Sequence, residues 1–131
     1  MIPNAFQQYQ RVQTETASGG QLILLLYGGA IRFLGRADQA RQKGDRSAVV
    51  DDIFRAQAII GELAASLDHS VGGEVTKNLF DLYSYFTRRL TDAVVRKDEG
   101  AILEVINHLR ELKSTWEQAV QMTGRKSITA A

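Results

Sequence analysis

A chain of 131 residues is long enough to form one domain with its own core, and its 44% hydrophobic and 24% charged residues are ordinary for a globular protein. The net charge of +1 excludes the strong positive field that is typical of proteins that bind nucleic acids or anionic membranes. The absence of cysteine excludes disulfides, thiol nucleophiles and cysteine-based zinc sites, and it fits a reducing cytoplasm.

Targeting signals and helix breakers are sparse along the chain. No apolar run follows basic residues at the N-terminus, so we expect no signal peptide. The longest apolar run, Leu22–Tyr27, is far too short to span a bilayer, so we expect no membrane insertion. Pro3 is the only proline, and apolar residues recur at spacings of three and four, which predicts an all-helical chain.

Residues 1–20 are predicted to form an N-terminal arm outside the main fold, either mobile or short-helical. Phe6, Tyr9 and Val12 are spaced by three, which is enough for one or two amphipathic turns. A helix this short is marginal in water by itself. Two interpretations stay open: a disordered leader, or an arm whose aromatic residues dock on the bundle or on a partner.

The first long helix is predicted over residues 21–42, with apolar residues on a core face and on one flank. On the flank, Leu24 and Ile31 are seven residues apart, and so are Gly28 and Gly35. Together with Tyr27, this alternation of large and small residues predicts a shallow groove that another helix can enter closely. Packing inside the bundle is the alternative role for these glycines. The expected core face consists of Leu22, Ile23, Leu26, Ala30, Phe33 and Ala37.

The second helix, predicted over residues 46–67, has apolar residues on two faces. Gly44 suits the left-handed residue that follows a helix, and Asp45 suits the N-cap of the next one. One stripe is expected to face the core and consists of Ile53, Ala56, Ile60, Leu63 and Leu67. The other exceeds what a small bundle needs for its own core, so it suits a further helix lying against it. This second stripe consists of Val50, Phe54, Ala58, Gly61 and Ala65.

Two further helices are predicted over residues 74–96 and 101–122, with Gly124 as a stop and residues 124–131 as a disordered tail. The core stripe of the third helix is expected to be Val75, Leu79, Leu82, Phe86, Leu90 and Ala93. That of the fourth is expected to be Ile102, Val105, Leu109, Leu112, Trp116 and Ala119. The apolar face of the third helix is widened by Phe80, Tyr83 and Val94.

Four amphipathic helices with short connections predict an all-α fold, an antiparallel up-down-up-down four-helix bundle over residues 21–123. Nothing in the sequence indicates an enzyme, and Gly72-Gly73 lacks the lysine and hydroxyl residues of a phosphate-binding loop. Glu104 and His108 share a helix face, but that face is opposite Leu109, so solvent exposure is expected there rather than a metal site. We therefore expect no metal, no cofactor and no nucleic acid.

Several short motifs occur in an order and at spacings that resemble a known family. They are Gln21-Leu22-Ile23, Leu26-Tyr27-Gly28-Gly29-Ala30, Gly44-Asp45, Gly72-Gly73-Glu74, Asn78-Leu79, Leu82-Tyr83, Arg88-Arg89-Leu90 and Trp116, with Tyr9 and Val12 in the leader. This set resembles the flagellin-specific secretion chaperones, the FliS family. The chain departs from the family pattern at Gly19-Gly20, where a Ser-Pro pair is frequent, and at Gly28, where an acidic residue is usual.

The resemblance implies a cytoplasmic, non-enzymatic chaperone of the flagellar type III export system. Such a chaperone binds the disordered C-terminal segment of flagellin, prevents premature polymerisation, and helps to deliver its client to the cytoplasmic domain of the export gate. From the residues alone, the alternative is a structural helical bundle that homo-oligomerises through its second apolar stripes, for instance as a homodimer of the free protein.

The two stripes and the resemblance together give a set of candidate client-binding residues: Leu24, Tyr27, Ile31, Val50, Phe54, Ala58, Gly61, Ala65, Phe80 and Tyr83. For Phe80, Tyr83 and the neighbouring Val94, a wide core face is the open alternative. Phe6, Tyr9 and Val12 are predicted to form an arm that covers the groove when the client is absent and engages the export gate when it is present.

Overall fold

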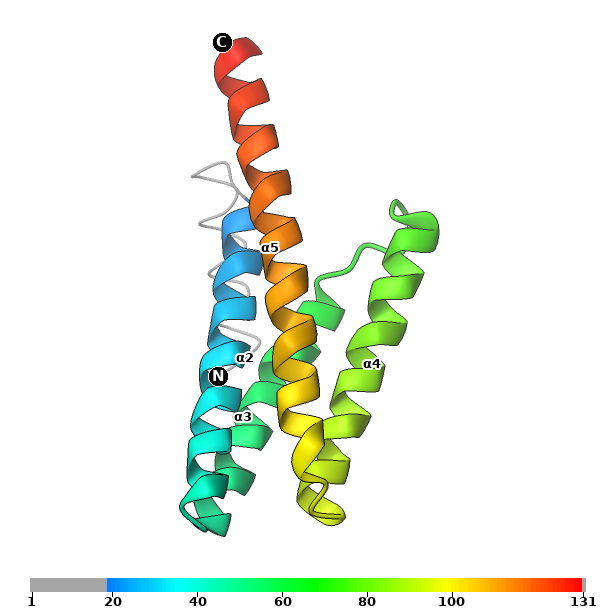
Figure 1. Cartoon of the computed structure of the whole chain (residues 1–131). Helices are drawn as coiled ribbons and strands as arrows, with labels where there is room; N and C mark the ends of the chain where they lie inside the picture. Colours follow the sequence, from blue (N-terminus) through cyan, green and yellow to red (C-terminus); the bar gives the residue numbers. More distant parts are fainter. Residues whose placement is uncertain (1–18, 131) are drawn as a thin grey trace.

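The computed structural model describes the backbone of residues 19–130 and the side chains of residues 19–122. This part of the chain forms four helices, α2 (Gly19–Gln42), α3 (Arg46–Ala65), α4 (Gly73–Val95) and α5 (Glu99–Ala130) (Figure 1). The predicted all-α, antiparallel four-helix bundle is confirmed. The predicted arm residues Phe6, Tyr9 and Val12 lie outside the described residues.

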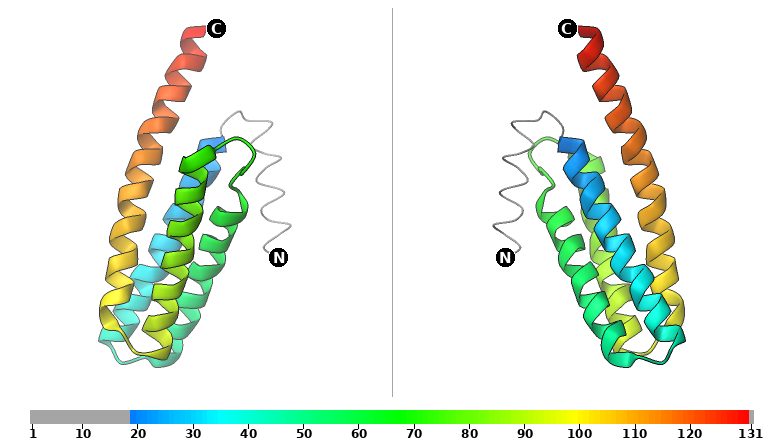
Figure 2. Two further views of the ribbon diagram at one scale, coloured as in Figure 1. Left: turned by 90° about the vertical axis from the view of Figure 1, so that its right-hand side faces the viewer. Right: turned by 90° about the vertical axis from the view of Figure 1, so that its left-hand side faces the viewer.

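The helices follow one another around the bundle. Helix α2 packs against α3 and α5, and α4 packs against the same two helices, whereas α2 and α4 make no close backbone contact within the described part of the chain. The α2–α3 and α4–α5 connections lie at the same end of the bundle, at the bottom of both views in Figure 2. We call this the closed end, and the opposite end, where α2 begins and α3 connects to α4, the open end.

Local signals set the helix boundaries at the closed end. Gly44 has a φ of 75° after α2, as the sequence predicts, and the Asp45 carboxylate accepts a hydrogen bond of 3.2 Å from the backbone N–H of Ala48 as the N-cap of α3. Lys97 also adopts a left-handed conformation, with a φ of 54°, in the turn between α4 and α5. A non-glycine residue pays a conformational cost at such a φ, so the turn is held by its surroundings.

Some predicted boundaries and core positions are wrong. Helix α5 continues past Gly124 to Ala130, where the sequence predicts a stop at 122 and a tail, because a glycine weakens a helix without forbidding it. Gly20 lies inside α2, not in the predicted arm before it. A Cβ at Gly20 would lie 2.2 Å from Val120 Cγ2, so the missing side chain lets α2 approach α5. The core face of α2 contains Leu34 rather than Phe33, which is only partly buried.

Large apolar side chains are buried in the interior toward the closed end. Phe86 and Leu90 of α4 are buried there against Ile102, Val105 and Leu109 of α5. Arg89 fastens the same two helices on their outer side, with ion pairs of 2.8 Å to Glu104, 2.9 Å to Asp98 and 3.2 Å to Asp92. Apolar burial and ion pairing therefore hold the closed end together.

Candidate functional site

The apolar stripes of α4 and α5 do not close against each other at the open end. Val75 continues the helix face that buries Phe86 and Leu90, yet its side chain is 68% exposed, and Ala119 is exposed at the corresponding level of α5. Figure 1 shows the reason: α4 and α5 approach each other near the closed end and diverge toward the open end. The prediction that Val75 and Ala119 belong to the core is therefore wrong.

The apolar residues between the exposed open end and the buried closed end of these two stripes are only half-buried. Leu79 and Leu82 of α4, and Leu112 and Trp116 of α5, pack against the edge of the core while part of each side chain remains accessible. Accessible apolar side chains gathered at one end of the bundle mark a candidate site for another protein segment. We call the set the open-end surface: Val75, Leu79, Leu82, Leu112, Trp116 and Ala119.

A hollow with a volume of about 480 Å³ lies between α2 and α5. Leu24 and Leu25 form its apolar wall, and Arg32 and Lys113 provide its polar rim. Leu25 is 61% exposed, which is unusual for a leucine within an apolar run. The predicted residue Leu24 therefore does lie on an accessible groove, next to Gly28, and the sequence analysis missed Leu25.

Another hollow, of about 240 Å³, lies between α3 and α4. Gly61 and Ala64 form its α3 side, and Thr87 and Arg88 form its α4 side, above the buried Tyr83. A Cβ added at Gly61 would meet no atom within 4 Å, so this glycine leaves open space rather than permitting a tight helix contact. Gly61 is thus on an accessible groove, as its place in the predicted set requires.

Two residues of the predicted set, Tyr27 and Tyr83, are not on the surface. Both are buried, at 0% and 2% exposure, and their hydroxyl oxygens lie 2.5 Å apart. Burial raises the pKa of both phenols, and the hydrogen bond adds to the rise at Tyr83. The mutual hydrogen bond satisfies both hydroxyls and offsets the free-energy cost of burying them, so these tyrosines belong to the core.

The rest of the predicted set is spread over more than one face of the bundle. Phe54 is 57% exposed, and Gly61 and Ala65 are also exposed, so the second stripe of α3 does face solvent. Phe80 is exposed as well, with its ring edge-on to His69 at a centroid distance of 5.6 Å. Partial burial is found at Leu24, Ile31, Val50, Ala58 and Val94.

The described residues offer little for chemistry. No group of three or more histidine or acidic side chains between residues 19 and 122 is placed to hold a metal ion. Glu104 is instead bound by the Tyr85 hydroxyl and by Arg89, which together lower the pKa of its carboxyl. None of the described helices is long and apolar enough to cross a membrane. The arrangement is suited to binding protein segments.

Comparison with known proteins agrees with this conclusion. Residues 2–123 match the family model described as flagellar protein FliS. The chain is 32% identical over 120 residues to the flagellar secretion chaperone FliS of Bacillus subtilis (strain 168), an alignment that covers 92% of this chain and 89% of the relative. Identity is 38% to the FliS chaperone of Salmonella typhimurium, with 88% and 89% covered, and 37% to the FliSB chaperone of Pseudomonas aeruginosa, with 86% and 93% covered.

Proposed function

Because the chain belongs to the family of the flagellar protein FliS, we propose that it is a flagellar secretion chaperone whose client is the disordered C-terminal segment of flagellin. The family consists of chaperones, so the chain acts by binding and not as an enzyme. In this proposal it works in the cytoplasm, keeps flagellin from polymerising early, and helps to deliver it to the export gate.

The open-end surface is the observation that carries this proposal. Its α4 and α5 stripes, each spaced by three and four residues, expose the apolar side chains Val75, Leu79, Leu82, Leu112 and Trp116 to different degrees. An amphipathic helix binds partner proteins by laying its apolar face, at positions i, i+3, i+4 and i+7, against exposed apolar side chains such as these. A client that would otherwise polymerise through its own apolar faces cannot do so while the chaperone covers them.

The hollows beside Leu24 and Gly61 extend the proposed client path to other faces of the bundle. They lie on the α2–α5 and α3–α4 sides, so one short helix cannot fill both of them and the open-end surface at once. A long disordered segment can, since it wraps a large area and pays its ordering cost on binding. Together with Phe54 and Ala58, these hollows are the proposed secondary contacts of the client.

The N-terminal arm has a role in the same proposal. Phe6, Tyr9 and Val12, which lie outside the described residues, are proposed to cover the client groove in the free chaperone and to take part in export-gate binding once the client displaces them. Deleting residues 1–13 should change client affinity or export. If both are unaltered, the arm has neither role.

Binding to a peptide with the sequence of a flagellin C-terminal segment tests the main proposal by calorimetry. Val75→Glu places a charge on the open-end surface without disturbing the core, because the side chain is already exposed. Val95→Glu is the matched control: it is the same substitution on the same helix, at a residue 73% exposed near the closed end. We expect Val75→Glu to weaken binding by at least about tenfold, or ~1.4 kcal/mol, and Val95→Glu to leave it unchanged.

Light scattering on the free protein separates the chaperone from the alternative of a homo-oligomeric bundle. Tight 1:1 binding of the peptide supports the chaperone. A concentration-dependent dimer that ignores the peptide and is disrupted by Val75→Glu would favour the oligomer instead.

A further inference from the structure

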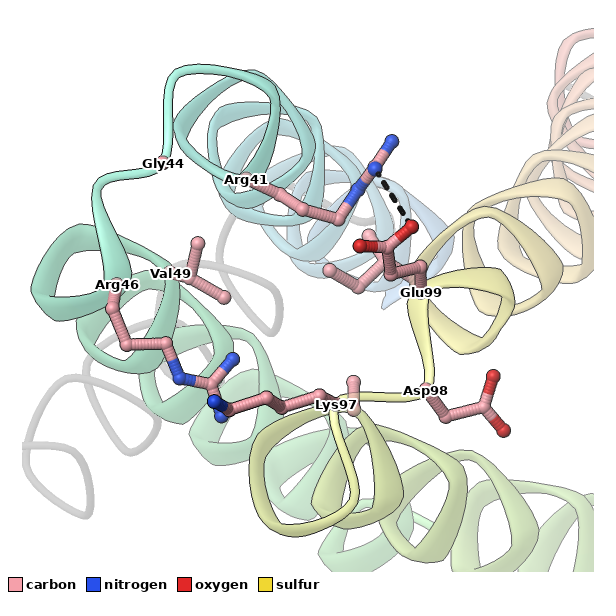
Figure 3. Close-up of a pocket in the computed structure, with 9 residues that line it drawn as sticks. Arg41, Gly44, Arg46, Val49, Lys97, Asp98 and Glu99 are labelled. Atoms are coloured by element: carbon pink, nitrogen blue, oxygen red, sulfur yellow. Dashed lines mark ion pairs between the residues drawn. The ribbon is translucent and has the colours of Figure 1, made fainter.

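A pocket of about 240 Å³ lies at the closed end, between the α2–α3 and α4–α5 connections. Its floor is formed by the buried apolar side chains of Val49, Ala93 and Ile102. The rim is charged and is provided by residues in the α4–α5 connection and at the helix ends beside both connections (Figure 3). Its members are Arg41, Arg46, Lys97, Asp98 and Glu99. This pocket is far from the open-end surface, and the proposed function does not use it.

The charges around the rim are unevenly matched. Arg41 is paired with Asp38 at 2.8 Å and with Glu99 at 3.5 Å. Asp98 forms an ion pair of 2.9 Å with Arg89, and its carboxylate points away from the pocket in Figure 3. Both acidic groups of the rim are therefore already engaged by other cations.

Arg46 and Lys97 remain on the opposite side of the pocket. Both line the pocket, and in the view of Figure 3 their side chains lie on the same side of it, opposite Arg41 and Glu99. Neither has an ion pair to an acidic side chain within the described part of the chain. The Arg46 guanidinium donates a hydrogen bond to the backbone carbonyl of Val94 near the end of α4, which holds it in place. Two cations without an acidic partner on the same side of a pocket attract an anion.

We propose that this pocket is a second protein-binding site, which takes an acidic segment of a partner protein. An aliphatic side chain of the partner enters the pocket above Ile102, and a neighbouring carboxylate binds between Arg46 and Lys97. The volume supports a side chain as occupant, because sites for drug-sized molecules are larger, about 300–1,000 Å³. Charge-assisted hydrogen bonds from both cations account for the preference for a carboxylate. Since the pocket and the open-end surface are at opposite ends, both are filled at once.

Amide chemical shifts of the full-length protein, followed during titration, test the proposal. The probe is the peptide acetyl-Ser-Leu-Glu-Ser-amide, and two others replace its glutamate by glutamine or its leucine by serine. We expect the first peptide to shift the amides of residues 44–49 and 93–102, and the other two to bind at least about tenfold more weakly, by ~1.4 kcal/mol. Equal binding of the glutamine peptide, or no shift up to millimolar concentration, overturns the proposal. So does inorganic phosphate if it binds as tightly as the first peptide.

A charge-removing variant connects the binding to the pocket. Lys97→Asn removes one cation, and asparagine tolerates the left-handed backbone at this position, so the fold is retained. Lys77→Gln, at an exposed lysine of α4 nearer the open end, changes the net charge equally and serves as the control. We expect Lys97→Asn to weaken binding of the first peptide by at least about tenfold and Lys77→Gln to have no effect. Unchanged affinity in Lys97→Asn overturns the proposal, and the melting temperature of each variant verifies that it is folded.

Discussion

The hydroxyl groups of Tyr27 and Tyr83 form a hydrogen bond that joins α2 to α4 through the interior of the bundle, although these two helices make no close backbone contact within the described part of the chain. The two rings are 6.4 Å apart between centroids and tilted by 55°. Tyr83 also contacts Phe86, with a centroid distance of 6.5 Å. The bond therefore connects opposite helices through the core.

Removing one partner of this pair should destabilise the protein by about 1–3 kcal/mol, because the other hydroxyl is left buried without its partner. We expect Tyr27→Phe to cost more than Tyr83→Phe, since the nearby Trp116 indole acts to lower the pKa of the Tyr27 phenol and so can still interact with its hydroxyl when only Tyr83 is changed. Urea unfolding followed by circular dichroism gives the free energies. The double variant should cost less than the sum of the two single ones, because no hydroxyl is then left unpaired. Additive losses would contradict coupling between the two residues.

The Arg89 cluster should make the stability depend on pH in the acidic range. Hydrogen bonding to Arg89 lowers the pKa of Asp98, and hydrogen bonds from Tyr85 and Arg89 lower the pKa of Glu104. In the unfolded chain these carboxyls titrate near their usual values, about 3.9 and 4.3. The stabilisation is therefore fully present above that range and is lost as the pH falls through the lower folded-state pKa values.

The variant Arg89→Gln tests this pH dependence. We expect it to lower the urea midpoint at pH 7 and to flatten the decline in stability between pH 5 and pH 2, because the two carboxyl groups lose their cation. The neighbouring Arg88→Gln is the control, since Arg88 is exposed and takes no part in the cluster. A decline of equal steepness in wild type and Arg89→Gln would assign the acid sensitivity to other groups.

Substitutions at Gly61 can test the proposed client contact without disturbing the fold. A Cβ there meets nothing within 4 Å, and the same holds for Gly35 on α2. Alanine at either position should stabilise the protein by about 0.5–1 kcal/mol, since glycine is unfavourable within a helix. Tryptophan at Gly61 should fill the α3–α4 hollow and weaken binding of the flagellin peptide. Unchanged affinity of Gly61→Trp by calorimetry would remove this hollow from the client path.

Gly20 should respond in the opposite way to Gly61. Because a Cβ at Gly20 would overlap Val120, Gly20→Ala should force α2 and α5 apart and destabilise the protein by about 1–3 kcal/mol. Gly28→Ala provides the comparison, since its Cβ would meet only ordinary contacts at 3.9 Å. Thermal unfolding should show a lower midpoint for the first variant and no loss for the second. Adding Val120→Ala should recover most of the loss, and a failure to recover would mean that the overlap is not its cause.

The helices and their connections at the closed end were predictable because their signals are local. Glycine at residue 44 and aspartate at residue 45 act through their own backbone and side chain, so neighbouring sequence is sufficient. Burial is not local. Tyr27 is expected on the groove flank, and its burial depends on a hydroxyl partner 56 residues away. For a similar reason Leu34 is buried in place of Phe33: Arg36 and Arg55 lie over the Phe33 ring at its partly exposed position.

The open-end surface could not be found from periodicity. The α4 stripe has the same three-and-four spacing at Val75, which is exposed, as at Leu90, which is buried. The difference comes from the inclination of α4 relative to α5, which depends on packing between whole helices. The second stripe of α3 with Phe54 was predicted from the excess of apolar residues, because that excess is a property of one helix alone. The function of the stripe stays a prediction.

The unequal anchoring of α4 has a mechanical consequence. Toward the closed end Phe86 and Leu90 are buried and Arg89 pairs with Glu104 at 2.8 Å, whereas Val75 near the start of the helix is 68% exposed. Regions with fewer buried apolar contacts open more readily than the packed core of the same protein. We therefore expect the spacing of α4 and α5 at the open end to adapt to the bulk of a bound segment while the closed end stays packed.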